Sequence, residues 1–88
     1  MREYDFDVFI QWDGTAGEDF LDRCEAALKD EFEGDATPAV QAGVPLVSCT
    51  MPGTSLEEAM EPVLLVLRDV RLSVKFVQFY PGMVERAA

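Results

Sequence analysis

The stretch Tyr4-Asp5-Phe6-Asp7-Val8-Phe9-Ile10-Gln11-Trp12 alternates apolar and polar side chains almost without interruption. One face of this stretch carries only large apolar or aromatic residues: Tyr4, Phe6, Val8, Ile10 and Trp12. The other face carries Asp5, Asp7, Phe9 and Gln11. A period of two combined with β-branched and aromatic residues is typical of a strand. The sequence therefore predicts a first strand over 4–12 that packs one face against a core.

An amphipathic helix is expected directly after this strand. Asp13-Gly14 marks a turn, and Thr15 followed by Glu18 fits a capping box. Apolar residues then recur at helical spacing: Phe20, Leu21, Cys24, Ala27, Leu28 and Phe32. We expect a helix over about 16–33, ended by Gly34, which can take a positive φ without a Cβ clash.

Most of the negative charge of the chain lies in this helix and its flanks. The segment 13–35 holds nine acidic residues against Arg23 and Lys29, a local charge of −7 out of −10 for all 88 residues. An ordinary surface helix would intersperse lysines, since like charges at i, i+4 cost a few tenths of a kcal/mol. The imbalance favours a basic partner, and a solubilising surface is the alternative. The candidate partner-binding residues are Glu18, Asp19, Asp22, Glu25, Asp30 and Glu33.

Three further elements follow. Asp35-Ala36-Thr37-Pro38 is expected to form a turn, and Ala42-Gly43 a tight hairpin between strands over 39–41 and 44–51. Thr54 and Ser55 begin two overlapping capping boxes for a helix over about 56–69, which Pro62 should kink near 58–62. A last strand is expected over 72–80, before Pro81-Gly82.

The order strand-helix-strand-strand-helix-strand predicts an α+β fold of the split βαβ, or ferredoxin-like, kind. Right-handed crossovers would place both helices on one face of a four-stranded antiparallel sheet, with strand order 4-1-3-2. We expect one domain over 1–82 and a frayed tail over 83–88.

The second face of the sheet is a candidate contact surface. Alternation along the last strand places Leu72, Val74, Phe76 and Tyr80 on the core face, and Val77 and Phe79 on the open face. With Phe9 they would form an exposed apolar patch, which monomers rarely tolerate when it is large. The residues expected to mediate homodimerisation or ligand contact are Phe9, Val77 and Phe79. Packing of these aromatics against each other and the tail is the alternative.

Composition excludes several classes of function. A net charge of −10 and a pI near 4.1 argue against direct binding to nucleic acid or to anionic membranes. The start of the sequence lacks the apolar segment of a signal peptide, and no apolar run approaches the roughly 20 residues that span a bilayer. These features predict a cytoplasmic protein, in which Cys24 and Cys49 would be buried, reduced thiols rather than a disulfide.

Few residues suggest chemistry. The chain has no His, no zinc-ligand spacing and no Gly-rich phosphate loop. Asp5 and Asp7 lie about 7 Å apart on one strand face and could hold Mg²⁺ or Ca²⁺, but a solvated strand face explains them more simply. Cys49 lacks a base to activate it as a nucleophile. We therefore expect neither a cofactor nor an enzymatic activity.

Asp35-Ala36, Ser55-Leu56-Glu57-Glu58-Ala59 and Asp69-Val70 resemble a family of small bacterial proteins of unknown function. The resemblance covers most of the chain and implies a ferredoxin-like domain. It transfers no catalytic or binding residue.

Two functional hypotheses follow. The first is a non-enzymatic module that docks its acidic face on a basic protein, for example as an antitoxin or as a DNA-mimicking inhibitor of the anti-CRISPR kind. Its partner would then be a nucleic-acid-binding protein. The second is a homodimeric, ligand-binding or regulatory domain that uses the open sheet face.

Overall fold

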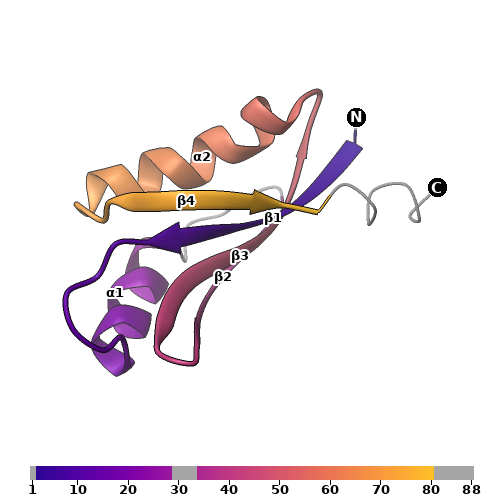
Figure 1. Ribbon diagram of the computed structural model, residues 1–88. Coiled ribbons are helices and arrows are strands. Elements are labelled where there is room, and N and C mark those ends of the chain that lie inside the picture. The colour runs from indigo at the N-terminus through magenta and orange to yellow at the C-terminus, as the bar shows by residue number, and fades with distance from the viewer. Residues whose placement is uncertain (1, 29–33, 81–88) are drawn as a thin grey trace.

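The computed structural model describes residues 2–28 and 34–80. Its elements are β1 (Arg2–Ile10), α1 (Glu18–Leu28), β2 (Asp35–Gln41), β3 (Val44–Gly53), α2 (Leu56–Asp69) and β4 (Val74–Phe79) (Figure 1). The four strands form one sheet in the order β2-β3-β1-β4, and every neighbouring pair is antiparallel. The predicted α+β fold with its ferredoxin-like strand order is confirmed.

The centre of the sheet is β1, the strand that the alternating N-terminal stretch predicts. It pairs with β3 along one side and with β4 along the other. Its alternate residues are fully buried, with Phe6 1% and Val8 0% exposed. The face of β1 that the helices cover must be apolar, and the opposite face can carry polar residues. Apolar and polar side chains therefore alternate along this strand.

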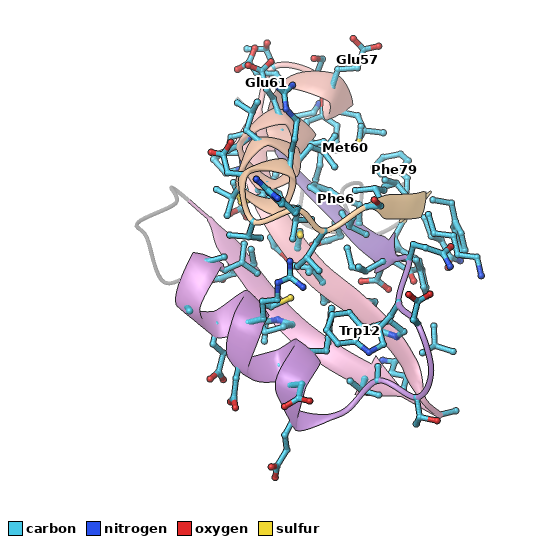
Figure 2. The ribbon with its side chains drawn as sticks, turned by 90° about the vertical axis from the view of Figure 1, so that its left-hand side faces the viewer. Phe6, Trp12, Glu57, Met60, Glu61 and Phe79 are labelled. Carbon is cyan, nitrogen blue, oxygen red and sulfur yellow. The ribbon has the colours of Figure 1, made fainter. Side chains whose placement is uncertain are left out.

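Both helices lie on the same side of the sheet, where Figure 2 shows them packed against the buried side chains of the strands. Each helix contributes one apolar stripe to the core: Phe20, Cys24 and Leu28 from α1, and Ala59, Val63 and Leu67 from α2. Trp12 packs edge-to-face on Phe20, with ring centroids 5.3 Å apart. Three of the apolar residues predicted at helical spacing in α1, Phe20, Cys24 and Leu28, are therefore confirmed as core residues.

The start predicted for α1 and the conformation predicted for Gly34 need correction. The helix begins at Glu18, and the carbonyl of Gly17 accepts the first intrahelical bond from Leu21, so the N-cap is Gly17 and not Thr15. Gly34 does not adopt a positive φ. It is a glycine because a Cβ at this position would lie 2.1 Å from the carbonyl oxygen of Thr50. The predicted end of the helix, including Phe32, lies outside the described residues.

The hairpin between β2 and β3 is present and is longer than expected. Residues 35–38, predicted as a turn, belong to β2 and pair with β3 up to Thr50. Pro38 does not prevent this, because β2 is an edge strand and a proline can occupy an edge position that needs no N–H. Ala42 and Gly43 have φ values of 52° and 80°, and a two-residue turn with both φ positive is of type I′.

Both ends of α2 are closed by recognisable motifs. The Ser55 hydroxyl accepts from the N–H of Glu58, as predicted, and the hydroxyl of Thr54 donates to the Glu58 carboxylate at 2.6 Å. At the other end, the N–H of Leu72 donates to the carbonyl of Leu67, and the N–H of Arg71 to the carbonyl of Arg68. This pair of bonds is a Schellman motif with Arg71 at its left-handed position. Pro62 lies inside α2, and the kink expected there stays a prediction.

The faces predicted for the residues of β4 after Lys75 are wrong. Phe79 pairs with Phe6 and Val77 pairs with Val8, so both side chains share the helix-covered face with buried residues of β1. In Figure 2, Phe79 lies on the α2 side of β4, together with Phe6 and Met60. The register shifts between the pairs Phe9–Phe76 and Ile10–Val74, which leaves Lys75 as an extra residue.

A one-residue bulge reverses which residues of a strand face the core. Alternation counted from the buried Leu72 therefore gives the wrong face for every residue beyond the bulge.

Candidate functional site

The exposed side of α1 is acidic, as the sequence predicts. Glu18, Asp19, Asp22 and Glu25 are all exposed. Glu18, Asp22 and Glu25 follow one another at i, i+4 and i+7, so they form one ridge along the helix, which we call the acidic ridge. The other two candidate partner-binding residues, Asp30 and Glu33, lie outside the described residues.

A groove of about 530 Å³ runs between α1 and the edge strand β2. Asp22 and Glu25 line it on the helix side, and Thr37 lines it on the strand side. The rest of its described lining is apolar: Ala26, Leu28, Ala36 and Pro38. The structure therefore places two carboxylates of the acidic ridge above an apolar surface next to β2, the edge strand of the described sheet. Sequence reasoning missed the groove because it assigned residues 35–38 to a turn.

Asp19 lies on another side of α1, apart from the groove. It lines a hollow of about 580 Å³ with Arg23 and Arg71. The Arg23 guanidinium donates to the carbonyl oxygen of Val70, the C-cap residue of α2. A cation at this position satisfies a helix-terminal carbonyl and complements the helix dipole. The single basic residue in the described part of α1 is thus directed towards α2.

The open sheet face carries an apolar row across the strands. Phe9 stacks on Phe76 with ring centroids 4.4 Å apart and an interplanar angle of 14°. Leu46 pairs with Phe9 on β3, and Val44 is close to the same end of the sheet. Phe76 and Val44 are 49% and 46% exposed. The predicted contact residue Phe9 is on this face, but Phe76 replaces Val77 and Phe79 as its neighbour on β4.

Asp5 and Asp7 lie on the polar half of the same face, and each accepts a hydrogen bond. The Thr50 hydroxyl donates to Asp5 at 2.6 Å, and the Tyr80 hydroxyl donates to Asp7 at 2.7 Å. The hydrogen bond to Asp7 is the main cause that raises the pKa of Tyr80 above its ordinary value. Among residues 2–28 and 34–80, no three His, Cys, Asp or Glu side chains are grouped as metal ligands.

Cys24 and Cys49 are free and buried, as expected. Burial raises the pKa of Cys24 from 9.0 to about 11. Burial, followed by the nearby charge of Asp7, raises the pKa of Cys49 to about 12. Both sulfurs are therefore protonated thiols at neutral pH, the opposite of an activated nucleophile.

These features define a small acidic α+β protein with a ferredoxin-like sheet, an acidic groove at one sheet edge and a partly apolar open face. Comparison with protein-family models, with curated proteins and with solved structures gave no match. The resemblance to a small bacterial family stays a prediction. Within the described parts of the chain, neither helix combines the length and apolarity needed to cross a membrane.

Proposed function

We propose that this protein is a non-enzymatic binding module that docks its acidic ridge on a basic protein. The observation that carries the proposal is the ridge itself, in which Glu18, Asp22 and Glu25 are exposed along one side of α1. Three carboxylates at this spacing repel each other at a small cost to the helix. A partner that supplies Lys or Arg would remove the repulsion and add charge-assisted contacts.

The direction of Arg23 supports this proposal. At i, i+4 from Asp19 and next to Asp22 in sequence, Arg23 is the single basic residue in the described part of α1. Its guanidinium is bonded to the Val70 carbonyl. Glu18, Asp22 and Glu25 are exposed, and their negative charges would steer a basic partner at low ionic strength and be screened over about 10 Å at 0.1 M salt.

One specific form of this function is inhibition of a nucleic-acid-binding protein. Such a protein presents a basic surface to phosphates, and a small acidic protein can occupy that surface in place of nucleic acid. An antitoxin role follows from the same charge complementarity. In either case the partner, and not the acidic protein, carries the activity that is measured.

Charge reversal on the ridge tests the proposal. The variant Asp22→Lys/Glu25→Lys and the matched variant Glu57→Lys/Glu61→Lys would each be immobilised and used to capture proteins from a lysate of the source organism. Glu57 and Glu61 are a suitable control because they lie on α2, at the opposite end of the molecule from α1 (Figure 2). We expect a basic protein captured by the wild type to be retained by the α2 variant and lost by the α1 variant.

Elution along a salt gradient completes this experiment. A complex dominated by charge should dissociate at moderate salt, because exposed ion pairs are screened. A captured partner whose retention is insensitive both to salt and to reversal of Asp22 and Glu25 would contradict the proposal.

A second candidate function is self-association through the open sheet face, favoured by the exposed Phe76 stacked on Phe9. Phe76→Asp should convert a dimer to a folded monomer in light scattering, since Phe76 is outside the core. Phe79→Asp is not a suitable test, because Phe79 packs against the core. An unchanged mass for Phe76→Asp would count against this candidate. The net charge of −10 on each copy opposes such a dimer.

A further inference from the structure

Among residues 2–28 and 34–80, no strand pairs with the outer edge of β2, since the sheet order ends at β2. The identity of the outward backbone groups follows from the hairpin. A two-residue turn closes on the pair Gln41–Val44, so alternate residues of β2 from Gln41 backwards direct their N–H and C=O towards β3. The intervening residues direct theirs outward: Ala36, Pro38 and Val40.

The position of Pro38 agrees with this assignment. Proline has no N–H to donate, so it belongs at an outward position of an edge strand. The outward edge then offers the N–H and C=O groups of Ala36 and Val40 and the carbonyl of Pro38. This is sufficient for a short added strand, while the missing donor at Pro38 discourages a long one.

Ala36, Pro38 and Val40 direct their backbone groups to the edge of the sheet, and their side chains lie on its helix-covered face. Ala36 and Pro38 line the groove beside Asp22 and Glu25. A strand added to β2 would therefore direct every second side chain into the groove. A Lys or Arg there would place its methylene groups on the apolar lining and its charge near the two carboxylates.

We infer that the β2 edge and the adjoining groove bind an extended basic segment, which adds a fifth strand to the sheet and inserts alternate Lys or Arg side chains between α1 and β2. The inference rests on the proposed function, because it specifies how the acidic ridge recognises its partner. Charge complementarity selects the occupant: the described lining contains Asp22 and Glu25 and no basic residue. A second copy, with a net charge of −10, fits less well.

The test uses wild-type protein and synthetic peptides. A fluorescent, end-capped Lys-Val-Lys-Val-Lys-Val peptide carries one lysine at every second position, and Lys-Lys-Lys-Val-Val-Val has the same composition and charge in blocks. Fluorescence anisotropy at about 50 mM salt would measure the dissociation constants. We expect the alternating peptide to bind about tenfold more tightly than the block peptide. In an added strand all three lysines of the alternating peptide face the groove, whereas the lysines of the block peptide point to both faces.

Backbone N-methylation tests strand addition directly. In an added antiparallel strand, the lysine amides point at β2 and the valine amides point away, and a parallel strand reverses the two sets. N-methylation of one set should therefore abolish binding, while N-methylation of the other set should leave it within about twofold. These peptides are compared on unaltered protein, so the result does not depend on how a variant folds.

Protein variants locate the site. Asp22→Asn/Glu25→Gln should weaken the alternating peptide about fivefold to tenfold, the effect of losing one or two exposed ion pairs. The control Glu57→Gln/Glu61→Gln, which removes two charges from α2, should change it by less than twofold.

Three results would overturn the inference. The first is the absence of measurable binding by the alternating peptide. The second is tolerance of both N-methylated sets, and the third is equal binding of the block peptide, which would indicate diffuse attraction to the helix. If the block peptide binds as tightly as the alternating peptide and Asp22→Asn/Glu25→Gln loses binding of both, the acidic ridge still binds basic partners. The proposed function would then stand without strand addition. The proposed function fails separately, if the lysate capture is indifferent to charge reversal on α1.

Discussion

At the scale of single residues, Ala42 is a position where sequence and backbone disagree. It has a φ of 52° in the type I′ turn between β2 and β3. A left-handed conformation costs a residue with a Cβ roughly 1–2 kcal/mol, and Asn or Gly tolerates it better. The turn is formed because Gly43 and the strong β3 pairing of its flanks outweigh the strain at Ala42.

Ala42→Asn should stabilise the protein by about 0.5–1 kcal/mol, because Asn-Gly is the preferred pair in a type I′ turn. Thermal denaturation should show a Tm increase of a few degrees, since about 1 kcal/mol corresponds to roughly 4–8 °C in a domain of this size. Gly43→Ala is the opposing control and should lower the Tm, because Gly43 has a φ of 80°. A lower Tm for Ala42→Asn would contradict this interpretation of the turn.

At the scale of elements, the end of α2 combines a helix cap with an interhelical contact. Arg71 occupies the left-handed position of the Schellman motif with a φ of 62°, where glycine is usual. The Leu72 side chain that follows is 5% exposed and belongs to the core. The Val70 carbonyl beside it accepts from Arg23 of α1. This one turn therefore connects both helices to β4.

Arg71→Gly should raise the free energy of unfolding by about 1 kcal/mol, because it removes the cost of a Cβ at positive φ. Arg71→Ala is the matched control, since it removes the same charge and keeps the strain. We expect urea denaturation to place Arg71→Gly above the wild type and Arg71→Ala at or below it. Equal stability of the two variants would show that the backbone at this position is not strained.

At the scale of the whole molecule, the buried thiols give the fold a pH dependence. Burial raises the pKa of Cys24 to about 11 and of Cys49 to about 12, from an ordinary value of 9.0. Between pH 9 and these values the unfolded chain loses protons that the folded protein keeps. Unfolding is therefore favoured as the pH rises, and the stabilisation is fully present only below about pH 9.

Urea denaturation under reducing conditions at pH 8 and pH 10.5 measures this effect. The wild type should lose stability on going to pH 10.5, and Cys24→Ala/Cys49→Ala should lose less, by roughly 2 kcal/mol for each thiol removed, or roughly 4 kcal/mol in all. The quantity compared is the change in the free energy of unfolding between the two pH values. The lower absolute stability expected for the double variant therefore does not affect the comparison. Tyr80 also titrates at high pH, but it is present in both proteins and cancels. An equal change in both proteins would contradict the effect of burial on the thiols.

The sequence by itself determined the elements and their order, because the evidence for them is local. Alternation fixed β1, the Ala42-Gly43 pair fixed the hairpin, and Ser55 with Glu58 fixed the start of α2. The order of elements and the handedness of crossovers then left one sheet arrangement. The acidic ridge was also evident, since three exposed carboxylates at helical spacing can be read without knowing what surrounds them.

Only the tertiary structure decided which faces and edges meet. The bulge at Lys75 reversed the exposed side of β4 and replaced Phe79 by Phe76 on the open face. Pairing with β3 drew residues 35–38 into a strand and so created the groove beside Asp22 and Glu25. The first outcome depends on pairing between β1 and β4, which are distant in sequence. The second depends on how far the hairpin pairing continues away from its turn, and neither leaves a local pattern in the sequence.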